Sequence, residues 1–131
     1  MPEKNPDPQV IPYLLYADPG AAMDWLVKTF AFTERARDVR SDGTVNHGEM
    51  QLDGGGVIMM GNPGPDFEGP AKVGAVTQLL AITITDLPAH RERAQAAGAT
   101  VSEINIRPHG ARTYSADDPE GHRWYFTEPI S

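Results

Sequence analysis

The apolar and polar positions of this chain follow the same order twice. In the first half, the apolar run Val10–Tyr16 is typical of a strand. Apolar residues then recur at helical spacing, which predicts an amphipathic helix over Ala21–Phe30. Asp18 is expected to cap this helix and Pro19 to occupy its first position. The first half therefore begins with a strand and a capped helix.

The second half repeats this order. Leu79–Ile84 is again an apolar strand, and Asp86, which lies 68 residues after Asp18, precedes a second predicted helix over about Pro88–Ala97. Gly98 is expected to end that helix. A strand, an aspartate, a proline and a helix that recur in each half indicate an internal duplication within one fold rather than a solenoid.

Three strand-like segments follow each predicted helix. Between the last two, Asp118–Gly121 suits a type I turn. We expect an α+β fold of two βαβββ modules, at about residues 9–60 and 76–128, in a single domain spanning 1–131. The linker is expected over 61–75 and a mobile tail over 1–8. The predicted strands are Thr33–Arg40, Val45–Leu52 and Gly56–Met60 in the first half, and Thr100–Arg107, Ala111–Ala116 and His122–Thr127 in the second.

Composition narrows the classes of function. With 131 residues the chain is long enough for one hydrophobic core. It has no cysteine, which excludes disulfides, thiolate metal sites and a cysteine nucleophile. The net charge of −7 disfavours nucleic-acid binding and suits a cationic small ligand. No apolar run approaches the ~20 residues of a membrane span, and the N-terminal segment lacks a signal-peptide pattern. We expect a cytoplasmic protein with no nucleic-acid or membrane partner.

Three segments resemble a known family. They are DPGAAMDW (18–25), HGEMQLDGGGVIMM (47–60) and GARTYSADDPEGHRWYF (110–126). Over residues 9–128 the chain resembles the vicinal-oxygen-chelate superfamily of glyoxalase I, bleomycin-resistance proteins and extradiol dioxygenases, and its PhnB-like branch in particular. The resemblance implies a curved mixed sheet around a cavity, helices on the convex side of that sheet, and a homodimer.

The resemblance also implies where a metal would bind. Metal-dependent members place His, Gln or Glu ligands on the first and last strand of each module. Those positions fall here on Ile11, Met59, Leu79 and Tyr125. A divalent cation needs about three to four converging nitrogen or oxygen donors. We therefore expect no cofactor and no metal at the usual positions.

Polar residues alternate along one predicted strand. His47, Glu49 and Gln51 share one face of it, opposite Met50 and Leu52. His47 and Glu49 are the candidate catalytic acid and base, or part of the polar floor of a ligand site. They could also be two ligands of a displaced metal site, or the three residues could form a solvated strand face. The full predicted ligand-binding set is Tyr13, His47, Glu49, Gln51, Met59, Arg112, Arg123 and Tyr125.

Two further residues have competing interpretations. Arg112 could bind a carboxylate or phosphate of a ligand, or pair with a surface acid such as Glu120. His90 lies among charged residues of the second predicted helix and is expected to be solvated surface.

Two functions of different class remain. The first is a metal-free protein that binds a small molecule, cationic or aromatic, in a sheet-lined cavity and sequesters an antibiotic or metabolite, as the resemblance to bleomycin-resistance proteins implies. The alternative is an enzyme of this superfamily, a lyase, isomerase or dioxygenase. It would use a non-standard metal site or a metal-free acid/base pair. The sequence leaves open whether the protein is an enzyme.

Overall fold

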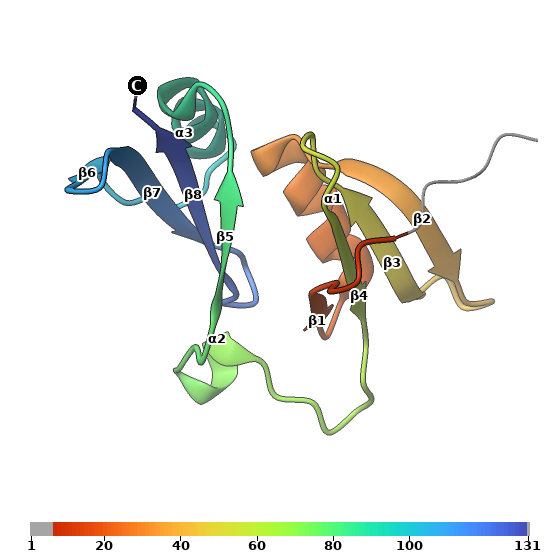
Figure 1. Ribbon diagram of the computed structural model, residues 1–131. Coiled ribbons are helices and arrows are strands. Elements are labelled where there is room, and N and C mark those ends of the chain that lie inside the picture. The colour runs from red at the N-terminus through yellow and green to blue at the C-terminus, as the bar shows by residue number, and fades with distance from the viewer. Residues whose placement is uncertain (1–6, 131) are drawn as a thin grey trace, which may run out of the picture.

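A computed structural model describes residues 7–130 and shows two modules of one strand, one helix and three strands (Figure 1). The first module consists of β1 (Tyr13–Leu15), α1 (Pro19–Phe30), β2 (Thr33–Val39), β3 (Val45–Gln51) and β4 (Val57–Gly61). The second consists of β5 (Leu79–Thr83), α3 (Leu87–Ala96), β6 (Asn105–Arg107), β7 (Ala111–Asp117) and β8 (Arg123–Pro129). The segment that joins them contains the short helix α2 (Pro70–Val73).

Each module has its own four-stranded mixed sheet. The strand orders are β1-β4-β3-β2 and β5-β8-β7-β6. In each sheet one outer pair, β1 with β4 and β5 with β8, is parallel, and the other pairs are antiparallel. The predicted α+β fold of two βαβββ modules is confirmed. The two modules form two separate four-stranded sheets, which do not join into one continuous sheet.

The predicted helix starts are confirmed by their hydrogen bonds. The Asp18 carboxylate accepts from the Ala21 amide at 3.0 Å, and Pro19 is the first residue of α1. The Asp86 carboxylate accepts from the Ala89 amide at 3.3 Å, although α3 begins one residue before Pro88. Side-chain caps of this kind satisfy amides that have no partner within the helix.

Two predicted strands are shorter than expected. Proline lacks the amide that a strand needs, so β1 begins only after Pro12, whose carbonyl still accepts from Met59 at 3.0 Å. Of the predicted strand 100–107, only Asn105–Arg107 pairs as a strand. The Ser102 hydroxyl accepts the Ser115 amide at 2.9 Å and so replaces a ladder bond there.

The segments around the modules also have defined features. Gly74, at φ 78°, ends α2 within the expected linker. Of the expected mobile tail, residues 1–6 lie outside the described part of the chain, while Asp7 forms an ion pair with Arg35 at 2.6 Å. No helix within residues 7–130 is long and apolar enough to cross a membrane.

The core lies between the helices and one face of each sheet, and it is shared by both modules. α1 contacts β3, α3 contacts β7 and β8, and the two helices contact each other. Met50 from the first sheet and Trp124 and Phe126 from the second are fully buried in one cluster. Gly48 lies on the helix side of β3, where the Met23 side chain occupies the space of a Cβ atom. The modules therefore pack as one body of apolar contacts.

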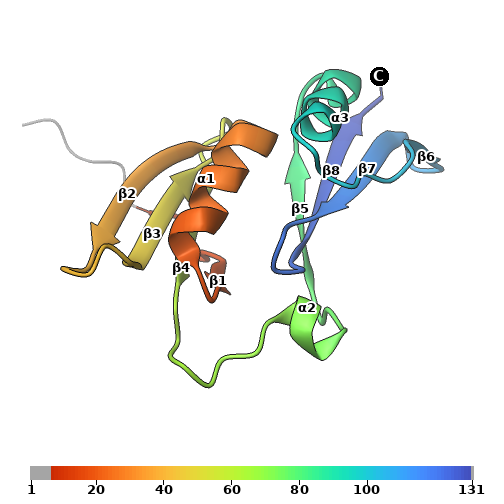
Figure 2. The same ribbon diagram turned by 180° about the vertical axis from the view of Figure 1, so that it is seen from behind.

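Polar contacts also join the modules, which stand side by side in both views (Figures 1 and 2). The Tyr16 hydroxyl donates to the buried Asp118 carboxylate at 2.5 Å, and the Trp124 indole donates to the same oxygen at 3.1 Å. The Glu120 carboxylate accepts from the amides of Ala17 and Asp18 at 2.7 and 3.0 Å. The turn between β7 and β8 thus holds the start of α1.

Candidate functional site

The faces of the two sheets that point away from α1 and α3, here called the open faces, hold most of the predicted ligand-binding residues. Apolar side chains on them are solvent-exposed: Tyr13 is 50%, Leu15 40% and Leu79 46% exposed. Their strand neighbours Leu14 and Leu80 point to the helix side and pack on the core. Alternation along β1 and β5 therefore places apolar groups on an uncovered surface.

Three polar residues form a hydrogen-bonded series on the open face of the first sheet. The Tyr13 hydroxyl and His47 Nδ1 are 3.0 Å apart. His47 Nε2 lies 2.9 Å from a carboxylate oxygen of Glu49. The His47 and Glu49 side chains are partly buried, at 31% and 20% exposure. The imidazole is thus held on both nitrogens, an arrangement that orients a histidine for binding or proton transfer.

A glycine allows this series to form. Tyr13 is on β1 and His47 on β3, so the tyrosine ring must cross β4, which lies between them. It crosses at Gly61, the register partner of His47. A Cβ atom at Gly61 would lie 2.6 Å from the Tyr13 hydroxyl oxygen, closer than such contacts normally are. Gly61 is therefore part of the site although it bears no functional group.

Arg35 on β2 extends the series toward the edge of the sheet. Its guanidinium lies 3.5 Å from Glu49 and 2.6 Å from Asp7. Arg35 could not be assigned to the site from the sequence, because a register irregularity between Glu34 and Ala36 breaks the alternation that would show which face of β2 it lies on. The only indication of its role in the sequence was that charged residues occur close to the strand that carries His47 and Glu49.

The open face of the second sheet carries a different set of groups. The Arg107 guanidinium donates to the Tyr125 hydroxyl at 3.1 Å. The hydroxyl of Thr113, and then Arg107, lower the pKa of Tyr125 below its usual value. Arg123 makes two bonds to Asp117, at 2.8 and 3.2 Å. These groups form two separate pairs rather than a connected series.

The remaining predicted site residues have separate positions. Met59 lies opposite Glu49 in the register, and Gln51 is exposed at the end of β3. Arg112 is on the helix side of its sheet, where its guanidinium binds the Glu128 carboxylate at 2.7 Å instead of Glu120. The structure thus brings Tyr13, His47 and Glu49 together and leaves Arg112 apart.

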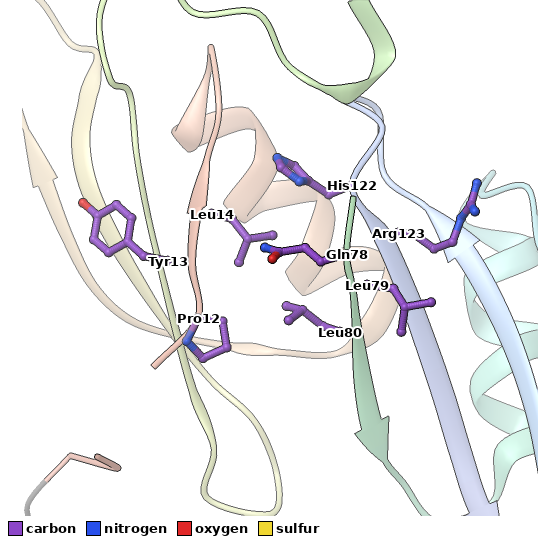
Figure 3. Close-up of a pocket in the computed structure, with 8 residues that line it drawn as sticks. All are labelled: Pro12, Tyr13, Leu14, Gln78, Leu79, Leu80, His122 and Arg123. Carbon is purple, nitrogen blue, oxygen red and sulfur yellow. The ribbon is translucent and has the colours of Figure 1, made fainter. Parts of the chain in front are cut away.

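The edge strands of the two sheets, β1 and β5, are separated by a small gap. Figure 3 shows Leu14, Gln78 and Leu80 directed into it, while Tyr13 and Leu79 point away. Its volume is about 30 Å³, room for about one water molecule. This gap is too small for an organic ligand, and most of the predicted ligand-binding residues lie instead on the open faces.

The residues at the family's metal positions do not fit a divalent cation. Ile11, Met59 and Leu79 offer no nitrogen or oxygen donor, and Tyr125 stands alone among them. Within residues 7–130, no three side chains of His, Cys, Asp or Glu converge as a metal site would require.

His90 is not solvated surface, contrary to the sequence prediction. Its ring stacks on Phe30 at 5.8 Å between centroids and lies 4.3 Å from the ring of Phe126. Nδ1 is hydrogen-bonded to the Tyr114 hydroxyl. Burial lowers the pKa of His90 from 6.5 to about 4, so the ring is neutral at pH 7. Its charged sequence neighbours concealed a histidine that turns toward the core.

Comparison with known proteins identifies the family to which this sequence is similar. A family model described as Glyoxalase/Bleomycin resistance protein/Dioxygenase superfamily matches residues 10–126. An uncharacterized protein of Mycobacterium bovis, Mb0911c, is 30% identical over 96% of this chain and 86% of its own length.

Two solved structures illustrate the likeness of fold. TioX from Micromonospora sp. ML1 is 32% identical with a TM-score of 0.74, covering 92% of this chain and 97% of TioX. TnmS3 from Streptomyces sp. CB03234, described as an antibiotic binding protein, is 18% identical with a TM-score of 0.72, covering 97% and 99% of the two chains.

Proposed function

This chain belongs to the glyoxalase/bleomycin resistance protein/dioxygenase superfamily, and from that premise we propose that it binds a small molecule on its open sheet faces. The observation that carries the proposal is the Tyr13–His47–Glu49 series, which lies beside exposed apolar side chains. Mostly apolar walls with a few oriented polar groups are the usual composition of a small-molecule site.

The ligand class follows from the surrounding groups. Tyr13 and Tyr125 present aromatic rings on which a flat molecule can stack. The net charge of −7 attracts cations over a distance. We therefore propose a cationic or aromatic ligand that is bound without a metal and sequestered. TnmS3, which is described as an antibiotic binding protein, supports an antibiotic or a related metabolite as the ligand.

A second copy of the chain would complete the pocket. The exposed Tyr13, Leu15 and Leu79 leave an apolar surface without a cover, and such surfaces mark contacts with other molecules. We propose a homodimer in the cytoplasm, in which each open face is covered by the partner. Light scattering on wild type and Leu79→Glu tests this. A monomeric wild type would contradict it.

The ligand proposal is tested with a cationic aromatic probe, ethidium, by equilibrium dialysis. Tyr13→Ala and His47→Ala should each weaken binding by about tenfold, since each removes a stacking or hydrogen-bonding contact worth about 1 kcal/mol or more. Gly61→Ala should also weaken binding, because it displaces the Tyr13 hydroxyl and leaves every polar group of the series in place.

The matched control is Glu92→Gln on α3. It changes the net charge of the exposed surface but not the open faces. Weaker binding in Glu92→Gln together with unchanged binding in Tyr13→Ala would mean that ethidium responds only to the overall charge. Unchanged affinity in Tyr13→Ala, with an unchanged melting temperature, would contradict binding at the open face.

One observation favours an enzyme as the second candidate function. His47 lies between a phenol and a carboxylate, so the Tyr13 hydroxyl can take a proton from a bound molecule while it passes its own proton to His47 Nδ1, and Glu49 stabilises the imidazolium. The test is exchange of the C–H proton next to the carbonyl of dihydroxyacetone in D₂O, followed by proton NMR. Exchange catalysed by wild type and lost in His47→Ala would support proton transfer. Equal rates in both would contradict it.

A further inference from the structure

A larger hollow lies between the two modules, away from the open faces. It is a cavity of about 560 Å³ bounded by the end of α1, the turn between β3 and β4, and the end of β5. Drug-sized ligands occupy cavities of about 300–1,000 Å³. Its apolar walls come from both modules: Phe30, Phe32 and Leu52 from the first, and Ile82 and Ile84 from the second.

The inner wall of this inter-module cavity is electrically neutral. His90 lines it, and burial lowers the pKa of that ring to about 4. The Glu128 carboxylate is bound by Arg112 and by the amides of Asp86 and Leu87, at 2.5 to 3.0 Å. Asp53, the other acidic residue of the wall, is exposed. An ionic ligand held against this inner wall would therefore lose its hydration without gaining a free counter-charge, because Asp53 lies at the exposed rim.

Contacts across the modules hold the walls of the cavity in place. Arg93 of α3 donates to the carbonyls of Lys28 and Val27 at 3.2 and 3.3 Å, which fixes the last turn of α1. The His90 ring stacks on Phe30 with an interplanar angle of 18°. Ala31, with φ 63°, ends α1 in the left-handed region and directs the chain into Phe32. Contacts between the two modules therefore hold the walls of the cavity in fixed positions.

We propose that the inter-module cavity binds an uncharged aromatic molecule, at a site separate from the open faces. Phe32 and His90, which line the cavity, offer aromatic contacts to a flat ligand, and Phe30 supports the His90 ring from behind. Ile82 and Ile84 offer the aliphatic wall on the other side. The ligand would contact both modules at once and would stabilise them against separation.

The probe is N-phenyl-1-naphthylamine, a neutral aromatic amine, and its binding is followed by equilibrium dialysis. We expect saturable binding of one probe per chain. Ile84→Glu should weaken that binding by about tenfold or more, because it brings a charge into the cavity. Val39→Glu adds the same charge at an exposed position at the far end of β2, away from the cavity, and it should leave the affinity within about twofold of wild type.

A second measurement does not depend on whether the variants fold. In methyl-labelled wild-type protein, the probe should shift the NMR signals of Ile82, Ile84 and Leu52, and not those of Leu79 and Leu15. Shifts confined to Leu79 and Leu15 would place the probe on the open face and overturn the proposal. Absence of saturable binding would overturn it as well. Neither result would affect the ethidium test, whose variants lie on the open faces.

Discussion

The two modules repeat one plan but hold the starts of their helices differently. In the first module, the amides of Ala17 and Asp18 are bound by Glu120, which belongs to the second module. In the second, the amides of Asp86 and Leu87 are bound by Glu128 on β8 of the same module. The first helix therefore depends on the partner module for its N-terminus, and the second does not. The duplicated halves are alike in local structure, but only the second module supplies a side chain that holds the other module's helix start.

The largest expected effect comes from Asp118, where the modules meet. Asp118→Ala removes the acceptor of the Tyr16 hydroxyl and the Trp124 indole, both buried. We expect a loss of about 3–5 kcal/mol in the free energy of unfolding, since buried donors without a partner cost about 1–3 kcal/mol each. Urea denaturation measures it.

Tyr16→Phe is the control for Asp118→Ala. It removes one donor and leaves the Asp118 carboxylate in place, so its cost should be about 1 kcal/mol. Equal costs for the two variants would mean that the Tyr16 hydroxyl contributes the whole effect, and that Asp118 does not organise the contact between the modules.

The next variants separate the two helix starts directly. Glu120→Ala should cost about 1–2 kcal/mol, since two amides lose a charged acceptor, and should speed hydrogen exchange at Ala17 and Asp18. Glu128→Ala should speed exchange at Asp86 and Leu87 only. NMR measurement of amide hydrogen exchange on both variants compares the two helix starts. Faster exchange at Asp86 in Glu120→Ala would show that the two starts are coupled.

A pH effect is expected from His90 at the contact between the modules. Its folded-state pKa is about 4 against 6.5 when unperturbed, so the unfolded chain binds the proton more readily. Stability is therefore complete above pH 6.5 and decreases as the pH falls toward 4. Allowing for the partial exposure of the ring, the loss should be about 1–2 kcal/mol.

The matched variant is His90→Gln, which keeps an acceptor for the Tyr114 hydroxyl. Its stability, measured by urea denaturation from pH 4 to pH 7, should change less than that of wild type over this range. Parallel curves for the two proteins would assign the pH dependence to other groups.

The smallest expected effect is a gain in stability. Ala31 ends α1 in the left-handed region at φ 63°, which glycine adopts without steric cost. Ala31→Gly should raise stability by up to about 1 kcal/mol, seen as a higher melting temperature. Ala97 ends α3 in the right-handed region at φ −77°, so Ala97→Gly should lower it. A decrease for both variants would contradict this account of the cap.

What could be predicted from the sequence was mostly local. The caps at Asp18 and Asp86 and the turn at Asp118–Gly121 depend on residues within four positions of each other, and the structure confirms them. The alternation of His47 and Glu49 likewise follows from the period of a strand. Such features need no knowledge of tertiary contacts.

The features that could not be predicted from the sequence depend on contacts between residues that are distant along the chain. Tyr13 and His47 are 34 positions apart, and their bond requires the register that places Gly61 between them. The orientation of His90 depends on Phe30 and Phe126, which lie far from it in the sequence. The short β6 results from a serine side chain that competes with the strand ladder. None of these follows from spacing alone.

The link between Tyr16 and Asp118 has a consequence for biosynthesis. The two residues are separated by 102 positions, so the tyrosine leaves the ribosome well before its acceptor is translated. Until the β7–β8 turn emerges, the first half of the chain has an unmatched phenol and an incomplete core. The first module should therefore reach its native state only after the β7–β8 turn has been synthesised and is free to fold.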